Sequence, residues 1–147
     1  MKHPALVLFP LFLAACSNNG NIAENAVTPP LNVTSETPGD WSELAGMIGR
    51  TPAASGLFEK SPVTIDLNAL LGPDAMRYRR AAETGSALVK DGPVLVTVGG
   101  DRTSYLVILP SDHAISAGLK QNGRWRVWTT PAAQVPEPAR IAALRAS

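Results

Sequence analysis

The chain has 147 residues with 13 basic and 12 acidic side chains, and its formal net charge is +1 at neutral pH. This balance provides no strongly basic stripe for nucleic acid, so we expect no nucleic-acid partner. The length fits one small domain, and hydrophobic residues, which make up 45% of the chain, are sufficient for a core.

The first 16 residues have the order of a secretory signal. A positively charged start (MKH) precedes an apolar run over 5–13 (ALVLFPLFL), and two small residues, Ala14 and Ala15, stand directly before Cys16. The apolar run is too short for a membrane-spanning helix, which needs about 20 such residues. The alternative for Cys16, the single cysteine, is a core position behind an ordinary signal, but a free thiol is a liability in an oxidising compartment.

The junction Leu13-Ala14-Ala15-Cys16 resembles the lipobox of bacterial lipoproteins. The resemblance implies that 1–15 is a signal peptide and that Cys16 becomes the lipidated first residue, carrying diacylglycerol on its thiol and a fatty acid such as palmitate on its amine. Two or more acyl chains anchor a protein stably in a membrane. Ser17 replaces the aspartate that usually retains such proteins in the inner membrane, so we expect the outer membrane, on the periplasmic side.

The segment after the cysteine is polar. Residues 17–39 are rich in Asn, Ser, Thr, Pro and Gly and have no apolar period. We therefore expect 16–39 to be a lipidated cysteine followed by a disordered tether, which as a flexible coil spans roughly 25–30 Å. The folded domain is expected over 40–147.

Helix caps and apolar repeats predict several short helices in this domain. Asp40 with Glu43 three residues later forms a capping-box pattern, and prolines at 62, 73 and 138 are each placed to begin a helix. A loop is expected over 51–56, and Gly72-Pro73 should separate two consecutive helices or kink one. The helices are expected over 41–48, 62–71, 74–83 and from Pro138, where Ile141 and Leu144 would point inward.

From residue 86 the pattern changes to short β-branched runs that are typical of strands. Residues 94–98 (VLVTV) and 105–109 (YLVIL) carry apolar side chains on both faces, so we expect a central hairpin that is buried on both sides. A short strand is also expected over 87–89. The whole pattern predicts an α+β fold with N-terminal short helices, an antiparallel meander of four to five strands and a short C-terminal helix.

The last hairpin has the clearest turn. Asn122-Gly123 predicts a type I′ turn, because both central residues of that turn need a positive φ. The turn fixes a register in which Lys120 pairs with Trp125 and Trp125 lies on the more polar face. The face predicted to meet the core carries Ile115, Ala117, Leu119, Arg126 and Trp128.

The sequence offers few groups for catalysis. His113 is the single histidine after the signal, so the usual zinc ligands cannot be assembled, and we expect no metal and no cofactor. His113 beside Asp112 favours a surface histidine over a hydrolase base. Gly99-Gly100-Asp101 lies between strands and not before a helix, which argues against a phosphate loop. A carboxylate pair of the glycosidase kind remains open among acids that have no distinctive context, but we expect a protein that is not an enzyme.

Two arginine-rich segments are candidate contact sites. The basic run over 77–80 (RYRR) is either a contact for an anionic partner or a solvated helix face. Arg124, Trp125, Arg126 and Trp128 have the composition of interface hot spots, although each tryptophan would also fit a core position.

The segment over 67–144 runs in a characteristic order: a helix with Leu70-Leu71-Gly72, then strand, loop, strand, a glycine-containing hairpin and a proline-rich end. This order resembles small periplasmic domains like the inhibitor of vertebrate lysozyme. The resemblance implies that the loop over 99–104, with Asp101 and Arg102, would enter the active cleft of lysozyme. In that family the loop is closed by a disulfide around a histidine, whereas here it has neither cysteine nor histidine.

The sequence thus predicts a lipoprotein held by its lipid anchor in the outer membrane, whose small domain binds another envelope or periplasmic protein. A lysozyme-type inhibitor acting through the 99–104 loop is the alternative, and a hydrolase that uses His113 and Asp112 is a third hypothesis. The candidate interaction residues are Asp101, Arg102, Arg124, Trp125 and Arg126.

Overall fold

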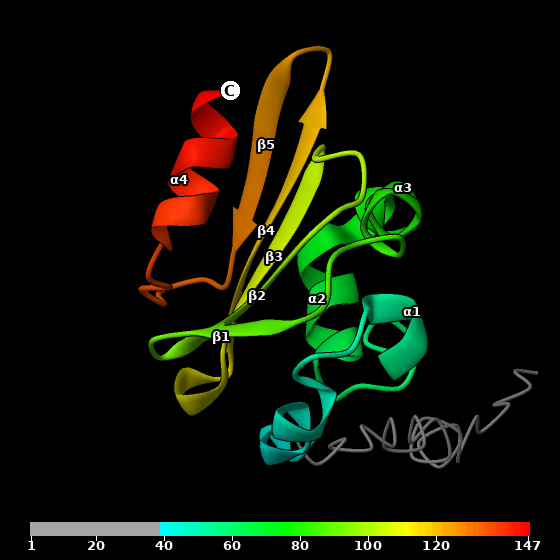
Figure 1. The fold of residues 1–147 in the computed structure, drawn as a ribbon, viewed down its shortest axis with the longest axis vertical. Coiled ribbons are helices and arrows are strands. Elements are labelled where there is room, and N and C mark those ends of the chain that lie inside the picture. Colours follow the sequence, from blue (N-terminus) through cyan, green and yellow to red (C-terminus); the bar gives the residue numbers. More distant parts are fainter. Residues whose placement is uncertain (1–38) are drawn as a thin grey trace, which may run out of the picture. The chain divides into compact units, whose positions relative to one another are not determined.

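A computed structural model describes residues 39–147 of the chain (Figure 1). The predicted signal peptide, the predicted lipidation at Cys16 and the predicted tether up to residue 38 lie outside the described residues. The fold is α+β, as the sequence predicts. Its α-helices are α1 (Pro52–Ser55), α2 (Val63–Leu71), α3 (Ala75–Ala82) and α4 (Ala139–Ala146), and its 3-10 helices are η1 (Trp41–Met47), η2 (Gly72–Asp74) and η3 (Pro110–Asp112). Its strands are β1 (Val89–Asp91), β2 (Val94–Val98), β3 (Ser104–Leu109), β4 (Ala114–Gln121) and β5 (Arg124–Thr129).

The first helix begins at the predicted cap. Asp40 Oδ1 accepts a hydrogen bond from the Ser42 backbone N–H at 2.9 Å, and η1 buries Trp41 and Leu44. The segment is a 3-10 helix, and its apolar residues pack against the sheet from one side.

The predicted loop over 51–56 is wrong, because 52–55 form the short helix α1. Thr51 caps this helix by accepting a hydrogen bond from Ala54 N at 3.3 Å, and Gly56 ends it with a φ of +68°. Thr51-Pro52 is an ordinary start of a helix, so the sequence did contain a capping signal. A helix of one turn is too short to show an apolar period, which is why the sequence predicted a loop.

The break at Gly72-Pro73 separates two consecutive helices, in agreement with the prediction. α2 ends at Leu71, η2 makes the bend, and α3 follows. Tyr78 of α3 is fully buried, and its hydroxyl donates to the backbone oxygen of Tyr105 at 2.6 Å. This bond ties the helices to the centre of the sheet.

The five strands form an antiparallel meander in the order β1-β2-β3-β4-β5. The predicted register of the last hairpin is confirmed, since Lys120 pairs with Trp125, and Asn122 and Gly123 have φ values of 51° and 75°. The central hairpin is buried on both faces, as predicted, and every residue of β3 is buried.

The first strand lies two residues later than predicted, at 89–91 instead of 87–89. Leu88 does not join the ladder because its backbone bonds to the turn that follows η1. Its oxygen accepts from Gly49 N at 2.8 Å, and its N–H donates to Arg50 O at 2.9 Å.

Helices cover both faces of the sheet, with α2 and α3 on one face and α4 on the other (Figure 1). Ile141 and Leu144 of α4 are buried, as predicted. The prediction that Trp125 lies on a polar face is wrong. That face is a second core covered by α4, and the half-buried Trp125 ring packs against it. Over residues 39–147, no helix has the length and apolar content needed to cross a membrane.

Candidate functional site

Two turns meet at one end of the sheet. In an antiparallel meander the β2–β3 and β4–β5 connections lie at the same end (Figure 1). They are joined directly, since the Lys120 backbone N–H donates to Thr103 O at 2.7 Å. We call the side chains gathered here the tip surface: Asp101, Arg102, Lys120, Arg124 and Trp125.

The loop between β2 and β3 is held in shape by Asp101. Its Oδ1 accepts hydrogen bonds from the backbone N–H of Thr103 at 3.0 Å and from the Thr103 hydroxyl at 2.7 Å. These bonds, the backbone one first, lower the pKa of the Asp101 carboxyl below its usual range. Arg102 has a φ of +60°, and its N–H donates to Gly99 O at 2.9 Å. The loop thus presents an exposed Arg102 side chain on an internally bonded backbone.

Trp125 is the aromatic centre of the tip surface. Its ring lies 5.5 Å from the ring of the buried Tyr105, and Lys120 Nζ lies 5.9 Å from the Trp125 ring centroid. That geometry is within cation–π range. The indole Nε1 is covered and has no hydrogen-bond partner within residues 39–147, so no hydrogen bond of the indole orients the ring.

The sheet divides the arginine and tryptophan cluster that the sequence placed together. Trp125 points to the face covered by α4. Arg126 points to the opposite face, which α2 and α3 cover, and its Nη1 lies 2.6 Å from Asp74 Oδ2. Arg126 also lies over Trp128, with its Cζ 4.8 Å from the ring centroid. Arg126 is therefore separated from Trp125 by the sheet. Arg124 shares the Arg126 side of β5 by alternation, but it is exposed directly beside the turn at the tip.

Arg102 also lines an open groove beside the tip surface. The groove has a volume of about 640 Å³ and runs between the 84–86 and 99–102 segments and α4. Arg140 lines the same groove and is paired with Asp91, its Nε lying 3.3 Å from Oδ2. Arg102, Lys120 and Arg124 outnumber Asp101, the one carboxylate of the tip surface, so this surface carries a net positive charge.

His113 is not part of the tip surface. It follows η3 with a φ of 48°, and its exposed ring stacks on Trp41 at 5.0 Å between centroids. In the described part of the chain, no hydrogen bond joins its ring to Asp112 or to a serine. The geometry gives the hydrolase hypothesis no support.

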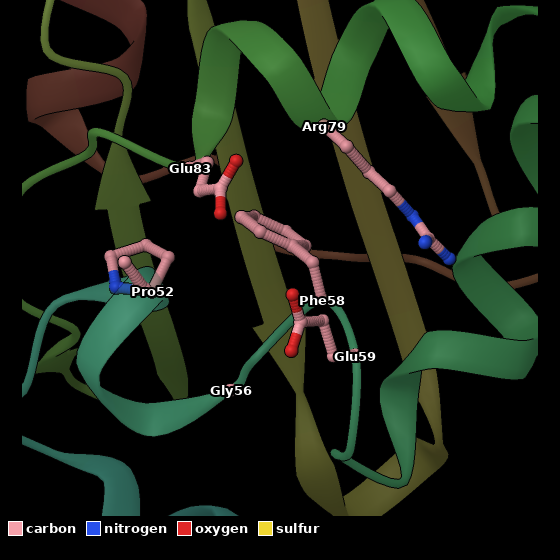
Figure 2. Close-up of a pocket in the computed structure, with 7 residues that line it drawn as sticks. Pro52, Gly56, Phe58, Glu59, Arg79 and Glu83 are labelled. Atoms are coloured by element: carbon pink, nitrogen blue, oxygen red, sulfur yellow. The ribbon is translucent and has the colours of Figure 1, made fainter.

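A small cavity lies among α1, the segment after it and α3 (Figure 2). Figure 2 shows the Phe58 ring between the carboxylates of Glu59 and Glu83, while Arg79 extends away from them. Arg79 Nη2 donates to Asn68 Oδ1. The volume of about 70 Å³ admits a few water molecules but is below the size of an ordinary ligand pocket, roughly 300–1,000 Å³.

Two of the three arginines in the basic run over 77–80 contact side chains of the same chain. In the basic run, Arg77 lies 4.0 Å from Asp74, and Arg79 is turned toward α2 as described. Residues 39–147 contain no group of three or more His, Cys, Asp or Glu side chains placed to hold a metal ion.

Sequence reasoning did not include Lys120, Tyr105 and Arg140 in the site. Lys120 was within reach, because the Asn122-Gly123 register already set it opposite Trp125. Tyr105 and Arg140 come from other elements, and no local pattern signals their approach. Comparisons of the chain with protein-family models, with curated proteins and with solved structures found no match.

Proposed function

We propose that this protein is a lipoprotein anchored in the outer membrane through Cys16, whose domain binds another envelope or periplasmic protein through the tip surface. The binding role is supported by one observation: the β2–β3 and β4–β5 connections lie side by side next to Trp125. Lys120 Nζ lies 5.9 Å from the centroid of this partly exposed ring, and the exposed Arg102 and Arg124 belong to the two connections at this end of the sheet. Arginine and tryptophan are the residues that dominate binding energy at protein interfaces.

The charge of the tip surface defines the partner. Arg102 and Arg124 are exposed, Lys120 is half-buried, and the Asp101 carboxylate accepts hydrogen bonds from Thr103. A complementary surface would carry carboxylates around an apolar patch that accepts the edge of Trp125. Such complementary charges act mainly on the rate of association and on the choice of partner, so binding should weaken as salt is raised.

The anchor is tested at Cys16. We expect the Cys16→Ser chain to leave the membrane fraction or to remain unprocessed with 1–15 attached, because the acyl chains that bind the bilayer can no longer be added. Fractionation of envelopes with a size comparison on gels measures both outcomes. A Cys16→Ser chain that stays in the membrane at the mature size would show that the anchor is wrong.

The binding surface is tested on the full-length lipoprotein in intact envelopes. A chemical crosslinker should trap a partner that mass spectrometry identifies, and Trp125→Ala should lower the trapped amount about tenfold, the effect of about 1.4 kcal/mol. Lys90→Ala is the matched control, since Lys90 is an exposed cation near the opposite end of the sheet. Equal loss in both variants, or no loss in either, would contradict the assignment.

One observation favours a second candidate, an inhibitor of lysozyme-type enzymes. The internally bonded loop presents Arg102 at its exposed tip, and the cleft of such enzymes contains two catalytic carboxyl groups to which a cation is complementary. Arg102→Ala should then raise the inhibition constant about tenfold, whereas Arg124→Ala, outside the loop, should change it little. An inhibition constant unchanged by Arg102→Ala, or no inhibition by the unaltered chain, would reject this candidate.

A further inference from the structure

The two edges of the sheet are built differently. β1 has three residues, and the chain just before it is bonded through Leu88 to Gly49 and Arg50. β5 has six residues and forms the opposite edge. It contains no proline and no bulge in its pairing with β4, so it lacks two common devices that block the pairing of an edge with another strand.

The pairing with β4 shows which backbone groups of β5 are free. Thr130 N donates to Ile115 O at 2.9 Å, so residue 130 faces β4, and residues 124, 126 and 128 share this direction by the alternation of an antiparallel ladder. The N–H and C=O groups of Trp125, Val127 and Thr129 consequently point away from the sheet. Within residues 39–147, no hydrogen bond joins these groups to another segment.

The side chains of β5 suit a second copy of the same strand. Val127 lies at the middle of β5 and is 38% exposed, which is unusual for an apolar residue in this sheet. Arg126 is engaged within its own chain, since Asp74 Oδ2 lies 2.6 Å from its Nη1. Self-pairing buries the exposed valine.

We propose that two copies of this protein pair antiparallel through β5, centred on Val127, to form one continuous sheet across a twofold axis. In this register Val127 faces the partner's Val127, and Arg126 faces the partner's Trp128, a cation opposite an aromatic ring. The three outward N–H groups of each copy donate to the outward carbonyls of the other. The interface uses the same patch on both copies, as a twofold dimer requires.

The two twofold registers centred on Arg126 and on Trp128 are less favourable. A seam centred on Arg126 sets that residue opposite the partner's Arg126, and like charges directly opposite destabilise a pair. A seam centred on Trp128 sets Trp125 opposite the partner's Pro131, which lies beyond the end of β5 and has no N–H to donate. The inference is independent of the proposed function, because it uses the edge of the sheet and no property of the anchor or of a partner protein.

Single cysteines in the full-length chain test the register. Directly opposite residues of a hydrogen-bonded pair have Cα atoms about 5.5 Å apart, within the range of roughly 4.4–6.8 Å that a disulfide spans. Under mild oxidation of intact envelopes, Val127→Cys should give a reducible dimer at twice the mass. Lys90→Cys on β1 is the matched edge control. The unaltered chain shows whether Cys16 itself crosslinks, which it can do only if its thiol is not lipidated. This control separates failure of the proposed anchor from failure of the proposed dimer.

A proline variant tests the hydrogen bonds of the seam. The Thr129 N–H points outward, so Thr129→Pro removes a donor of the seam and leaves the backbone bonds to β4 intact, although it also removes the hydrogen bond from the Thr129 hydroxyl to Ser116 Oγ. Added to Val127→Cys, it should lower the yield of crosslinked dimer about tenfold, the effect of about 1.4 kcal/mol. Resistance to protease in the same envelopes checks that the variant is folded. No dimer with Val127→Cys, a higher yield from Arg126→Cys or Trp128→Cys, or a crosslink only to a different protein would overturn the proposal.

Discussion

Replacing Gly118 with alanine should lower the free energy of unfolding by about 2–3 kcal/mol. Gly118 of β4 pairs with Tyr105 of β3, and a Cβ added to it would lie 2.1 Å from Tyr105 Cε1 and 2.5 Å from Cζ. The tyrosine ring cannot simply turn aside, because it is 2% exposed and packed against Trp125. Urea denaturation followed by tryptophan fluorescence measures the change.

Two comparisons separate this clash from a general effect of glycine replacement. Gly46→Ala should cost almost nothing or stabilise slightly, since nothing lies within 4 Å of its Cβ position and Gly46 is in η1. In a Tyr105→Leu background, Gly118→Ala should cost at least about 1 kcal/mol less than in the native chain, because the obstructing ring is absent. Equal costs in both backgrounds would show that the ring does not set the requirement for glycine.

The two pairings of Gly118 differ in how far the sequence predicts them. The Asn122-Gly123 turn fixes the β4–β5 register from two residues alone, and that register is confirmed along the hairpin. The pairing of Gly118 with Tyr105 depends on the β3–β4 connection, where His113 adopts a φ of 48° that its residue type does not announce. A register set by a three-residue 3-10 turn is therefore readable only in the structure.

The same reasoning applies to the tip surface. Lys120 and Trp125 are adjacent because of a local turn, so their proximity follows from the sequence. Their proximity to Asp101 and Arg102 follows from the Lys120–Thr103 hydrogen bond across two strands, which no local pattern encodes. The ion pair of Arg126 with Asp74 joins residues of different elements, and it removes Arg126 from a cluster that chain proximity had suggested.

Periodicity along the last hairpin underestimated the burial of one of its faces. The alternation along β4 identified one buried face correctly, with Ile115, Ala117 and Leu119 all buried. The opposite face looked polar at the hairpin because Lys120 and Trp125 stand there, yet α4 covers the rest of it. A helix that begins 18 residues after Gln121 closes that face, so its effect on burial depends on the path of the chain after β5.

The largest effect of pH should appear in alkali and should come from the two tyrosines. Burial raises the pKa of Tyr78 well above its ordinary value, and burial also raises the pKa of Tyr105. In the unfolded chain each hydroxyl titrates near pH 10, so above that pH the folded state retains protons that the unfolded state has lost. Stability is fully present below about pH 10 and then falls by about 1.4 kcal/mol per pH unit for each tyrosine still protonated in the fold.

Tyr78→Phe separates the two contributions of that hydroxyl. At neutral pH the variant should be about 1–2 kcal/mol less stable, because the buried hydrogen bond to Tyr105 O is lost. Above about pH 10 its stability should fall less steeply than that of the native chain, since one titrating group with a raised pKa is gone. The two curves of unfolding free energy against pH must therefore converge in alkali, with Tyr105→Phe as the control that retains the Tyr78 slope. Parallel curves would mean that Tyr78 ionises in the fold as readily as in the unfolded chain, which its fully buried position and its bond across 27 residues to the central strand argue against.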